Sequence, residues 1–181
     1  MKADPAVLTA RPMRISFDID ETLVCRHTDV PNEVGRLPLF LHRRLAEPLR
    51  RGTRTLIQQL RQQGWHIWIY TSSARTKFHI WLWLFLYGIR VDGIINEQKH
   101  RLELADRRFS RLPSKYPPAF GIDLHVDDSE GVRMEGEEHN FQVAVVRPED
   151  ENWTQRVLDA ASRCRANQPS IGTAPPITKP L

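Results

Sequence analysis

The feature that most constrains this chain is the alternation of short apolar runs with segments of helical character. Five runs have the character of strands: 13–19, 65–70, 91–96, 122–126 and 141–146. Apolar residues at helical spacing occupy 53–63, 74–87 and 152–163. Buried strands that alternate with helices predict an α/β domain whose sheet is mainly parallel and covered on both faces.

Glycines and polar residues set the expected limits of these elements. Thr53 is placed to cap the first helix, Gly64 to stop it, and Gly88 to close the second. Residues 28–38, TDVPNEVGRLP, are rich in turn formers and predict a hairpin-like flap after the first strand. Residues 97–118 are charged and broken by prolines, so we expect an irregular connection with no more than a helical turn.

The length of 181 residues fits one domain. We expect an N-terminal arm at 1–12, a single domain at 13–164, and a Pro-rich, disordered tail at 165–181. The net charge of +4 favours anionic partners, but it is too small and dispersed to mark a dedicated nucleic-acid binder.

The cysteines and the N-terminal sequence indicate the cellular compartment of the protein. Cys25 and Cys164 form no CxxC pair and no cluster with histidine, which argues against a disulfide framework and against zinc. The N-terminus has no apolar run long enough for a signal peptide. These features predict a cytoplasmic protein that does not enter a membrane.

Three of the predicted strands end in polar residues. Asp18 and Asp20 follow the first strand, Thr71 begins a polar cluster after the second, and Asp127 and Asp128 follow the fourth. If the strands are parallel, these groups meet at one edge of the sheet. A hard cation is the simplest remedy for the repulsion among such acids, and oxygen ligands without His or Cys favour Mg²⁺ over zinc. Such a centre suits phosphoryl chemistry.

The spacing of Asp18 and Asp20 predicts that the two acids have different roles. Two residues apart on an extended chain, Asp18 and Asp20 point to the same side, so one can attack phosphorus while the other exchanges a proton with the leaving group. A lone DxD is more often a charged turn. Here it occurs in order with the polar strand end at Thr71, a downstream lysine and the stretch HVDDSEG, 125–131.

These stretches resemble the motifs of the haloacid dehalogenase superfamily, in its phosphatase branch. FDIDETLV is similar to the first motif, DxDxT, IWIYTSS to the second, and LHVDDSEGV to the fourth, while SKYPPAFGID could hold the lysine of the third. The motifs span Ile15 to Val132. The resemblance implies a Rossmann-like, three-layer α/β/α sandwich with strand order 5-4-1-2-3.

The resemblance also implies roles for single residues. Asp18 is the nucleophile that forms an aspartyl-phosphate, and Asp20 is the general acid and base. Magnesium is held by the Asp18 carboxylate, the main-chain carbonyl of Asp20, and Asp128 with Asp127 near it. The phosphoryl group is bound by Thr71, Ser72 and a lysine, for which Lys115 is favoured over Lys99.

The spacing of the motifs bears on the substrate. The gaps between them leave no room for a separate cap domain, so we expect an open site that takes a phosphorylated macromolecule, or a small molecule if a partner supplies a lid. Nucleotides, sugar phosphates, phosphoproteins and nucleic-acid ends are all compatible with the sequence.

One helix-like segment has no polar face. Residues 78–89, FHIWLWLFLYGI, are apolar almost all round, yet twelve residues are too few to span a bilayer. The segment is either buried within the chain or is an interface for a homo-oligomer or a protein partner. The alternatives to a hydrolase are therefore a phosphotransferase of the same fold and a non-catalytic scaffold that recruits a partner through 78–89.

Overall fold

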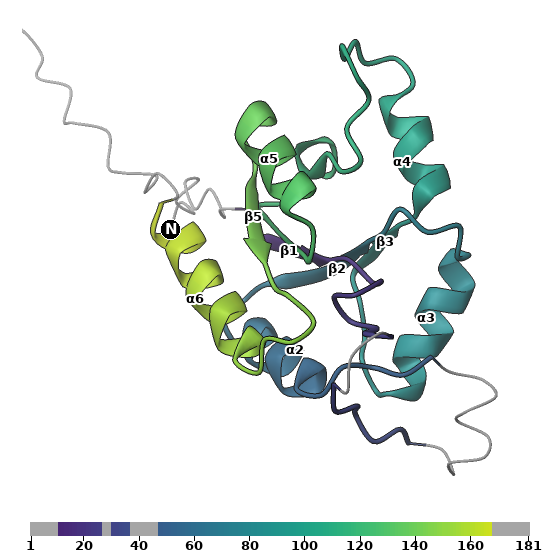
Figure 1. Ribbon diagram of the computed structural model, residues 1–181, viewed down its shortest axis with the longest axis vertical. Coiled ribbons are helices and arrows are strands. Elements are labelled where there is room, and N and C mark those ends of the chain that lie inside the picture. The colour runs from purple at the N-terminus through teal and green to yellow at the C-terminus, as the bar shows by residue number, and fades with distance from the viewer. Residues whose placement is uncertain (1–10, 27–29, 37–46, 168–181) are drawn as a thin grey trace, which may run out of the picture.

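The central sheet has five strands, all parallel, in the order β3-β2-β1-β4-β5. A computed structural model describes residues 11–26, 30–36 and 47–167 (Figure 1). Read from the other edge, the sheet has the order that the family resemblance implies, which confirms the predicted fold class. The strands are β1 (Arg14–Phe17), β2 (His66–Tyr70), β3 (Gly93–Ile95), β4 (Leu124–Asp127) and β5 (Gln142–Val145).

Helices cover the sheet on both sides (Figure 1). They are α2 (Thr53–Gln62), α3 (Lys77–Leu86), α4 (Glu97–Leu104), α5 (Glu130–His139), α6 (Trp153–Ala166) and the 3-10 helix η1 (Pro117–Phe120). Buried residues of α2, α3 and α6 form one large apolar cluster with Ile15, Ile67 and Val126 of the sheet. Each fully buried aliphatic or aromatic side chain contributes about 1.5–3 kcal/mol to this core.

The opposite face of the sheet is buried but partly polar. Successive side chains of a strand point to opposite faces, so Ser16 and His125 lie opposite the apolar Ile15 and Val126. Tyr70 belongs to a small cluster on this second face, with Ile95, Phe120 and Ile122. Buried polar groups must be hydrogen-bonded, and those of the second face build the site described below.

Two helices were not expected from the sequence. Helix α4 occupies part of the segment predicted to be irregular, and its start is capped by Asn96, whose side chain accepts a hydrogen bond from Lys99 N. Helix α5 lies in a stretch for which no helix was predicted. Its start is capped by Ser129, and Gly136 packs so tightly that an added Cβ would lie 2.7 Å from Phe141 O.

The predicted helix limits hold with small corrections. The chain takes positive φ values at Gly64 (83°) and Gly88 (78°), the two predicted stop positions. Gly52, not Thr53, is the cap of α2, and the Thr53 hydroxyl instead donates to Arg50 O at 2.6 Å. Helix α3 begins at Lys77 rather than residue 74, because the side chain of Thr76 caps it by accepting from His79 N.

Several predictions concern residues outside the described ranges. The proposed arm at 1–12 is described only from residue 11, and the tail at 165–181 only to residue 167. Of the proposed flap, 30–36 are described, and there the single bridge pairs Asn32 with Arg50 rather than closing a hairpin.

Helix α3 buries one side and exposes the other. Ile80, Trp83 and Leu84 are fully buried, whereas Phe78, Trp81 and Phe85 are 68%, 45% and 46% exposed. The three exposed rings stack in a column, with centroids 6.0 and 5.3 Å apart. Within the described residues, no helix is both long enough and apolar enough to cross a bilayer.

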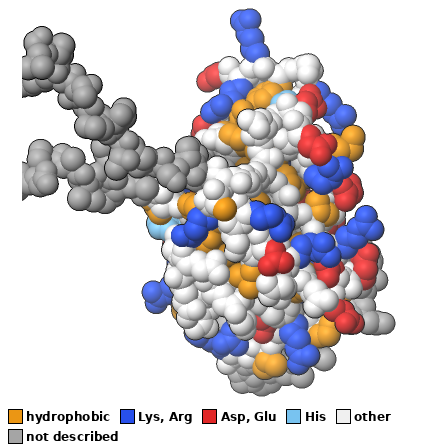
Figure 2. Space-filling view, turned by 90° about the vertical axis from the view of Figure 1, so that its left-hand side faces the viewer, with side chains coloured by type: hydrophobic (Ala, Val, Ile, Leu, Met, Phe, Trp, Pro, Cys, Tyr) orange, Lys and Arg blue, Asp and Glu red, His pale blue; other side chains and the backbone are white. Residues whose placement is uncertain are grey.

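Charges on the surface are mixed in sign. Figure 2 shows the side of the molecule that carries α6, where basic and acidic side chains alternate without a large patch of either sign. This side therefore has the dispersed charge expected from the sequence.

Candidate active site

Asp18 lies at the carboxyl end of β1, the central strand of the sheet. Its amide donates to Val126 O at 2.9 Å, which fixes the backbone against β4. The residue is 6% exposed. Burial raises the pKa of Asp18 to about 6, and the repulsion of Asp127 adds to this, while the ammonium of Lys115 acts in the opposite direction. The negative charge of this buried carboxylate therefore needs a cation nearby to stabilise it.

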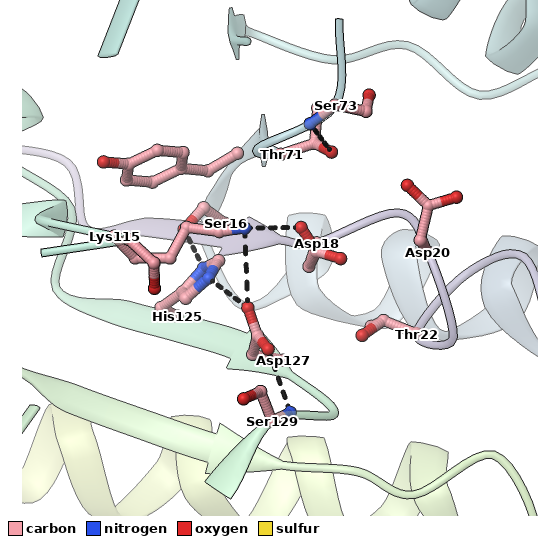
Figure 3. Close-up of polar contacts among 12 residues, drawn as sticks. Ser16, Asp18, Asp20, Thr22, Thr71, Ser73, Lys115, His125, Asp127 and Ser129 are labelled. Atoms are coloured by element: carbon pink, nitrogen blue, oxygen red, sulfur yellow. Dashed lines mark hydrogen bonds and ion pairs between the residues drawn. The ribbon is translucent and has the colours of Figure 1, made fainter. Parts of the chain in front are cut away.

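Lys115 provides such a cation. Its Nζ donates to Asp18 Oδ1 at 2.6 Å and lies 3.7 Å from Asp127 Oδ2 (Figure 3). Lys99, the competing candidate, lies elsewhere, with its Nζ over the rings of Trp68 and Phe120 at 5.4 and 5.6 Å. Of the two lysines, the structure brings Lys115 to Asp18.

The loop that carries Lys115 is held in place by α5. The Glu135 carboxylate accepts from Ser114 N at 2.9 Å, from Ser114 Oγ at 2.7 Å and from Lys115 N at 3.2 Å. One carboxylate therefore fixes both the backbone and a side chain immediately before the ammonium-bearing residue.

Tyr70 and His100 hold the same loop from the sheet side. Burial lowers the pKa of His100, so its neutral ring can accept at Nδ1 while Nε2 donates to Pro113 O at 3.1 Å. The Tyr70 hydroxyl donates to that Nδ1 at 2.5 Å and accepts from Tyr116 N at 2.8 Å. Burial also raises the pKa of Tyr70, which keeps this hydroxyl protonated.

Asp127 sits at the end of a buried hydrogen-bonded chain. His125 Nε2 donates to its Oδ2 at 3.0 Å, and the hydroxyl of Ser16 donates to His125 Nδ1 at 2.8 Å, an arrangement that a single neutral tautomer satisfies. Ser129 N donates to its Oδ1 at 3.0 Å. Burial acts to raise the pKa of Asp127, but the interactions with His125, Lys115 and Ser129 together outweigh it and lower the pKa. Sequence reasoning placed His125 in the core or behind the site but did not find Ser16.

Asp128 contacts Thr22, a fully buried residue of the loop after β1. Thr22 Oγ1 donates to Asp128 Oδ1 at a long 3.4 Å, so this half-buried carboxylate is only weakly bound by protein groups. Burial raises the pKa of Asp128, and Asp127 next to it adds to the effect.

Thr71 lies at the end of β2, on the same edge of the sheet as Asp18 and Asp127 (Figure 3). It is buried, and its hydroxyl oxygen accepts from Ser73 N at 3.1 Å. Ser72, the other proposed phosphate ligand, is exposed and makes no polar contact with the described residues.

Asp20 has a partner that the sequence did not reveal. Its two carboxylate oxygens accept from Arg75 Nη1 and Nη2, each at 2.7 Å. In Figure 3 Asp20 lies on the other side of Asp18 from Lys115. The two aspartates thus stand at the same edge of the sheet but face different cations, and the spacing that predicted separate roles gave no hint of Arg75.

The donors around Asp18 suit a hard cation. Among the described residues no three His, Cys, Asp or Glu side chains form a ready-made metal cage. Two acids near this edge of the sheet, Asp18 and Asp128, have raised pKa values, and the main-chain oxygen of Asp20 accepts no hydrogen bond from the described residues. Mg²⁺ binds through one or two carboxylates and keeps several waters, so this all-oxygen set fits it better than zinc.

Comparison with known proteins gives information about the fold alone. Neither the protein-family models nor the curated proteins give a match. Among solved structures, a chain of the Pnkp1/Rnl/Hen1 complex is similar with a TM-score of 0.51 and 18% identity, over 76% of this chain and 47% of that one. A predicted HAD-like family hydrolase from Porphyromonas gingivalis gives a TM-score of 0.43 and 14% identity, over 88% of this chain and 100% of that one.

The chain spans about half the length of the first of these proteins. At such low identity the likeness describes the fold alone. The parallel sheet and its strand order agree with the Rossmann-like α/β architecture that the motifs implied.

Proposed function

We propose that this protein is a magnesium-dependent phosphomonoester hydrolase that acts through an aspartyl-phosphate on Asp18. The observation that carries the proposal is the position of the buried Asp18 carboxylate between two side chains of different chemistry, Lys115 and Asp20. On one side the Lys115 ammonium touches its Oδ1 at 2.6 Å, and on the other stands Asp20, 45% exposed in its side chain and oriented by Arg75. A nucleophile, a charge-neutralising cation and a proton carrier are thus present together.

The proposed reaction has two steps. In the first, an Asp18 oxygen forms a bond to phosphorus as the ester P–O bond breaks, and Asp20 gives its proton to the departing oxygen. In the second, Asp20 takes a proton from a water whose oxygen forms a bond to phosphorus as the bond between phosphorus and the Asp18 oxygen breaks. Inorganic phosphate leaves, and both aspartates return to their starting forms.

Other residues support these steps by charge and position. Lys115 offsets negative charge that builds up on the Asp18 and phosphoryl oxygens. Asp127 holds the ammonium from below at 3.7 Å, and we assign it a positioning role because His125 and Ser129 already use its oxygens. Thr71 is the proposed ligand of the phosphoryl oxygens.

Magnesium would be held by the carboxylates of Asp18 and Asp128 and the main-chain oxygen of Asp20. When bound, it would offset charge between an anionic substrate and the anionic nucleophile.

A second candidate is the non-catalytic scaffold, which the exposed column of Phe78, Trp81 and Phe85 favours. In that case the apolar face of α3 would bind a protein partner or a second copy of the chain. A scaffold needs no turnover, so the experiment below separates the two functions.

The test is a panel of phosphate esters with nucleotides, sugar phosphates, a phosphopeptide and a 3′-phosphorylated oligonucleotide, each with Mg²⁺ or with EDTA. We expect turnover that requires Mg²⁺, and its loss in Asp18→Asn and Asp20→Asn with the circular dichroism spectrum unchanged. Asp106→Asn, at an exposed position outside the site, is the matched control. Activity retained in Asp18→Asn contradicts the mechanism, and no turnover on any ester favours the scaffold.

A further inference from the structure

The guanidinium of Arg75 bridges two carboxylates. One edge binds Asp20, as described, and the other binds Glu47, with Nε donating to Oε1 at 2.7 Å and Nη2 to Oε2 at 2.8 Å. The Arg75 side chain is 15% exposed. A planar guanidinium that holds two carboxylates by paired hydrogen bonds has little freedom to rotate.

Glu47 supplies a permanent negative charge behind this arginine. Hydrogen bonds from Arg75 lower the pKa of Glu47 to about 2, and contact with Arg26 contributes as well. The attraction of Glu47 is therefore constant across the working pH range, and it holds Arg75 whatever the protonation state of Asp20.

Both ends of this bridge are tied to buried structure. The main-chain oxygen of Glu47 accepts from Trp83 Nε1 at 2.8 Å and from the Tyr87 hydroxyl at 2.9 Å, two fully buried side chains of the α3 region. The main-chain oxygen of Arg75 accepts from Asn96 Nδ2 at 3.1 Å. The guanidinium is thus held by residues whose main chains are bonded to buried side chains, whereas the Asp20 carboxylate that it binds is nearly half exposed.

From this geometry we infer that Arg75 is the residue that positions Asp20 for proton transfer to the leaving group, with Glu47 as its anchor. The inference rests on the proposed function. Arg75 uses one lone pair of each Asp20 oxygen, and Arg26 Nη2 lies 3.9 Å from Oδ1, so Oδ2 keeps its second lone pair open to the reacting oxygen. Asp20 is thereby presented in one orientation in both steps, first as acid and then as base.

A positioning role for the proton carrier predicts a dependence on the leaving group. An ester with an acidic leaving group, such as 2,4-dinitrophenyl phosphate, needs no proton, whereas an alkyl ester such as glycerol 1-phosphate cannot depart without one. General acid catalysis is worth about 10²–10⁴-fold. We expect Arg75→Gln to lower kcat for the alkyl ester about 10- to 100-fold more than for the dinitrophenyl ester.

The experiment measures kcat and KM for both esters in wild type, Arg75→Gln, Arg75→Lys and Glu47→Gln. Lysine keeps the charge but not the paired hydrogen bonds, so Arg75→Lys should show the same selective loss while remaining folded. Glu47→Gln should show a smaller loss of the same kind. Arg133→Gln is the matched control, because Arg133 also binds two carboxylates, Glu130 and Glu137, but on the exposed surface of α5.

The outcomes separate this inference from the proposed function. Equal losses on the two esters, or none, in both Arg75 variants contradict the positioning role even if Asp18→Asn is inactive. A wild-type protein that hydrolyses neither ester, nor any other on the panel, contradicts the proposed function and the inference with it.

Discussion

Lys115 and Asp18 are 97 positions apart in the sequence, and their side chains meet at 2.6 Å beneath the surface of the protein. β1 and β4 are parallel neighbours in the sheet, and the loop before β4 packs against the sheet face that carries Tyr70 before it reaches Arg14 at the amino end of β1. A buried carboxylate and a buried ammonium are each costly to desolvate, so removing one partner leaves the other uncompensated.

The first prediction separates the two candidate lysines. Lys115→Ala should lower kcat by about 10²–10³-fold, the usual loss when one charge-stabilising donor is removed from an active site. Lys99→Ala should stay within about two-fold of wild type, because its ammonium lies over aromatic rings away from Asp18. Steady-state kinetics on a substrate from the ester panel decides, and a larger effect at Lys99 would reverse the assignment.

Tyr70→Phe tests the support of the Lys115 loop. The change deletes a buried hydroxyl that donates to His100 and accepts from Tyr116 N, and leaves both groups without a partner. We expect a loss of about 1–3 kcal/mol in the free energy of unfolding, measured by urea denaturation. We also expect kcat to fall more than KM rises, since the loop that shifts carries the ammonium. Unchanged stability would show that water replaces the hydroxyl.

Glu47 makes the stability of the protein dependent on pH. Its pKa lies at about 2 in the folded state, below the ordinary value of 4.5, so the folded state binds fewer protons than the unfolded state between these limits. The stabilisation by Glu47 is therefore complete above about pH 5 and declines as the pH falls toward 2. Urea unfolding of wild type and Glu47→Gln at pH 7 and pH 3 should show a larger difference at pH 7. An equal difference at both values would mean that the charge of Glu47 does not matter.

The two faces of α3 should respond differently to truncation. Trp83→Ala removes a fully buried ring and should cost about 3–5 kcal/mol in the free energy of unfolding. Trp81→Ala removes a ring that is 45% exposed, and we expect less than about 1 kcal/mol. If sedimentation shows self-association of the wild type, Trp81→Ala should weaken it. A large loss of stability in Trp81→Ala of a monomer would instead place that ring in the core of the single chain.

The sheet was predictable because each strand is an apolar run bounded by turn residues, and parallel pairing then brings Asp18, Thr71 and Asp127 to one edge. Helix α5 was not predictable from periodicity, since only Val132 and Gly136 of its residues are buried. The hydrogen-bonded pair of Ser16 and His125 follows from strand alternation only once the register between β1 and β4 is known.

The ion pair between Arg75 and Glu47 was even harder to predict from the sequence. Ion pairs between residues far apart in the chain have no characteristic spacing, and an arginine after a strand is most often solvent-facing. Their role depends on three segments meeting in space: the loop after β1, the residues before α2, and the loop after β2.

The support of Lys115 by Glu135 also sets an order for biosynthesis. Asp18, Asp20 and Arg75 belong to the first part of the chain, which forms β1, β2 and β3, so a growing chain carries Asp18 long before Lys115. Even when residue 115 has been added, its loop is held from the sheet side by Tyr70 and His100 but lacks the Glu135 carboxylate until α5 is made. A nascent or truncated chain that ends before residue 115 therefore holds the Asp18 carboxylate without Lys115, and one that ends before α5 lacks part of the support of that lysine. The complete cluster is a late product of translation.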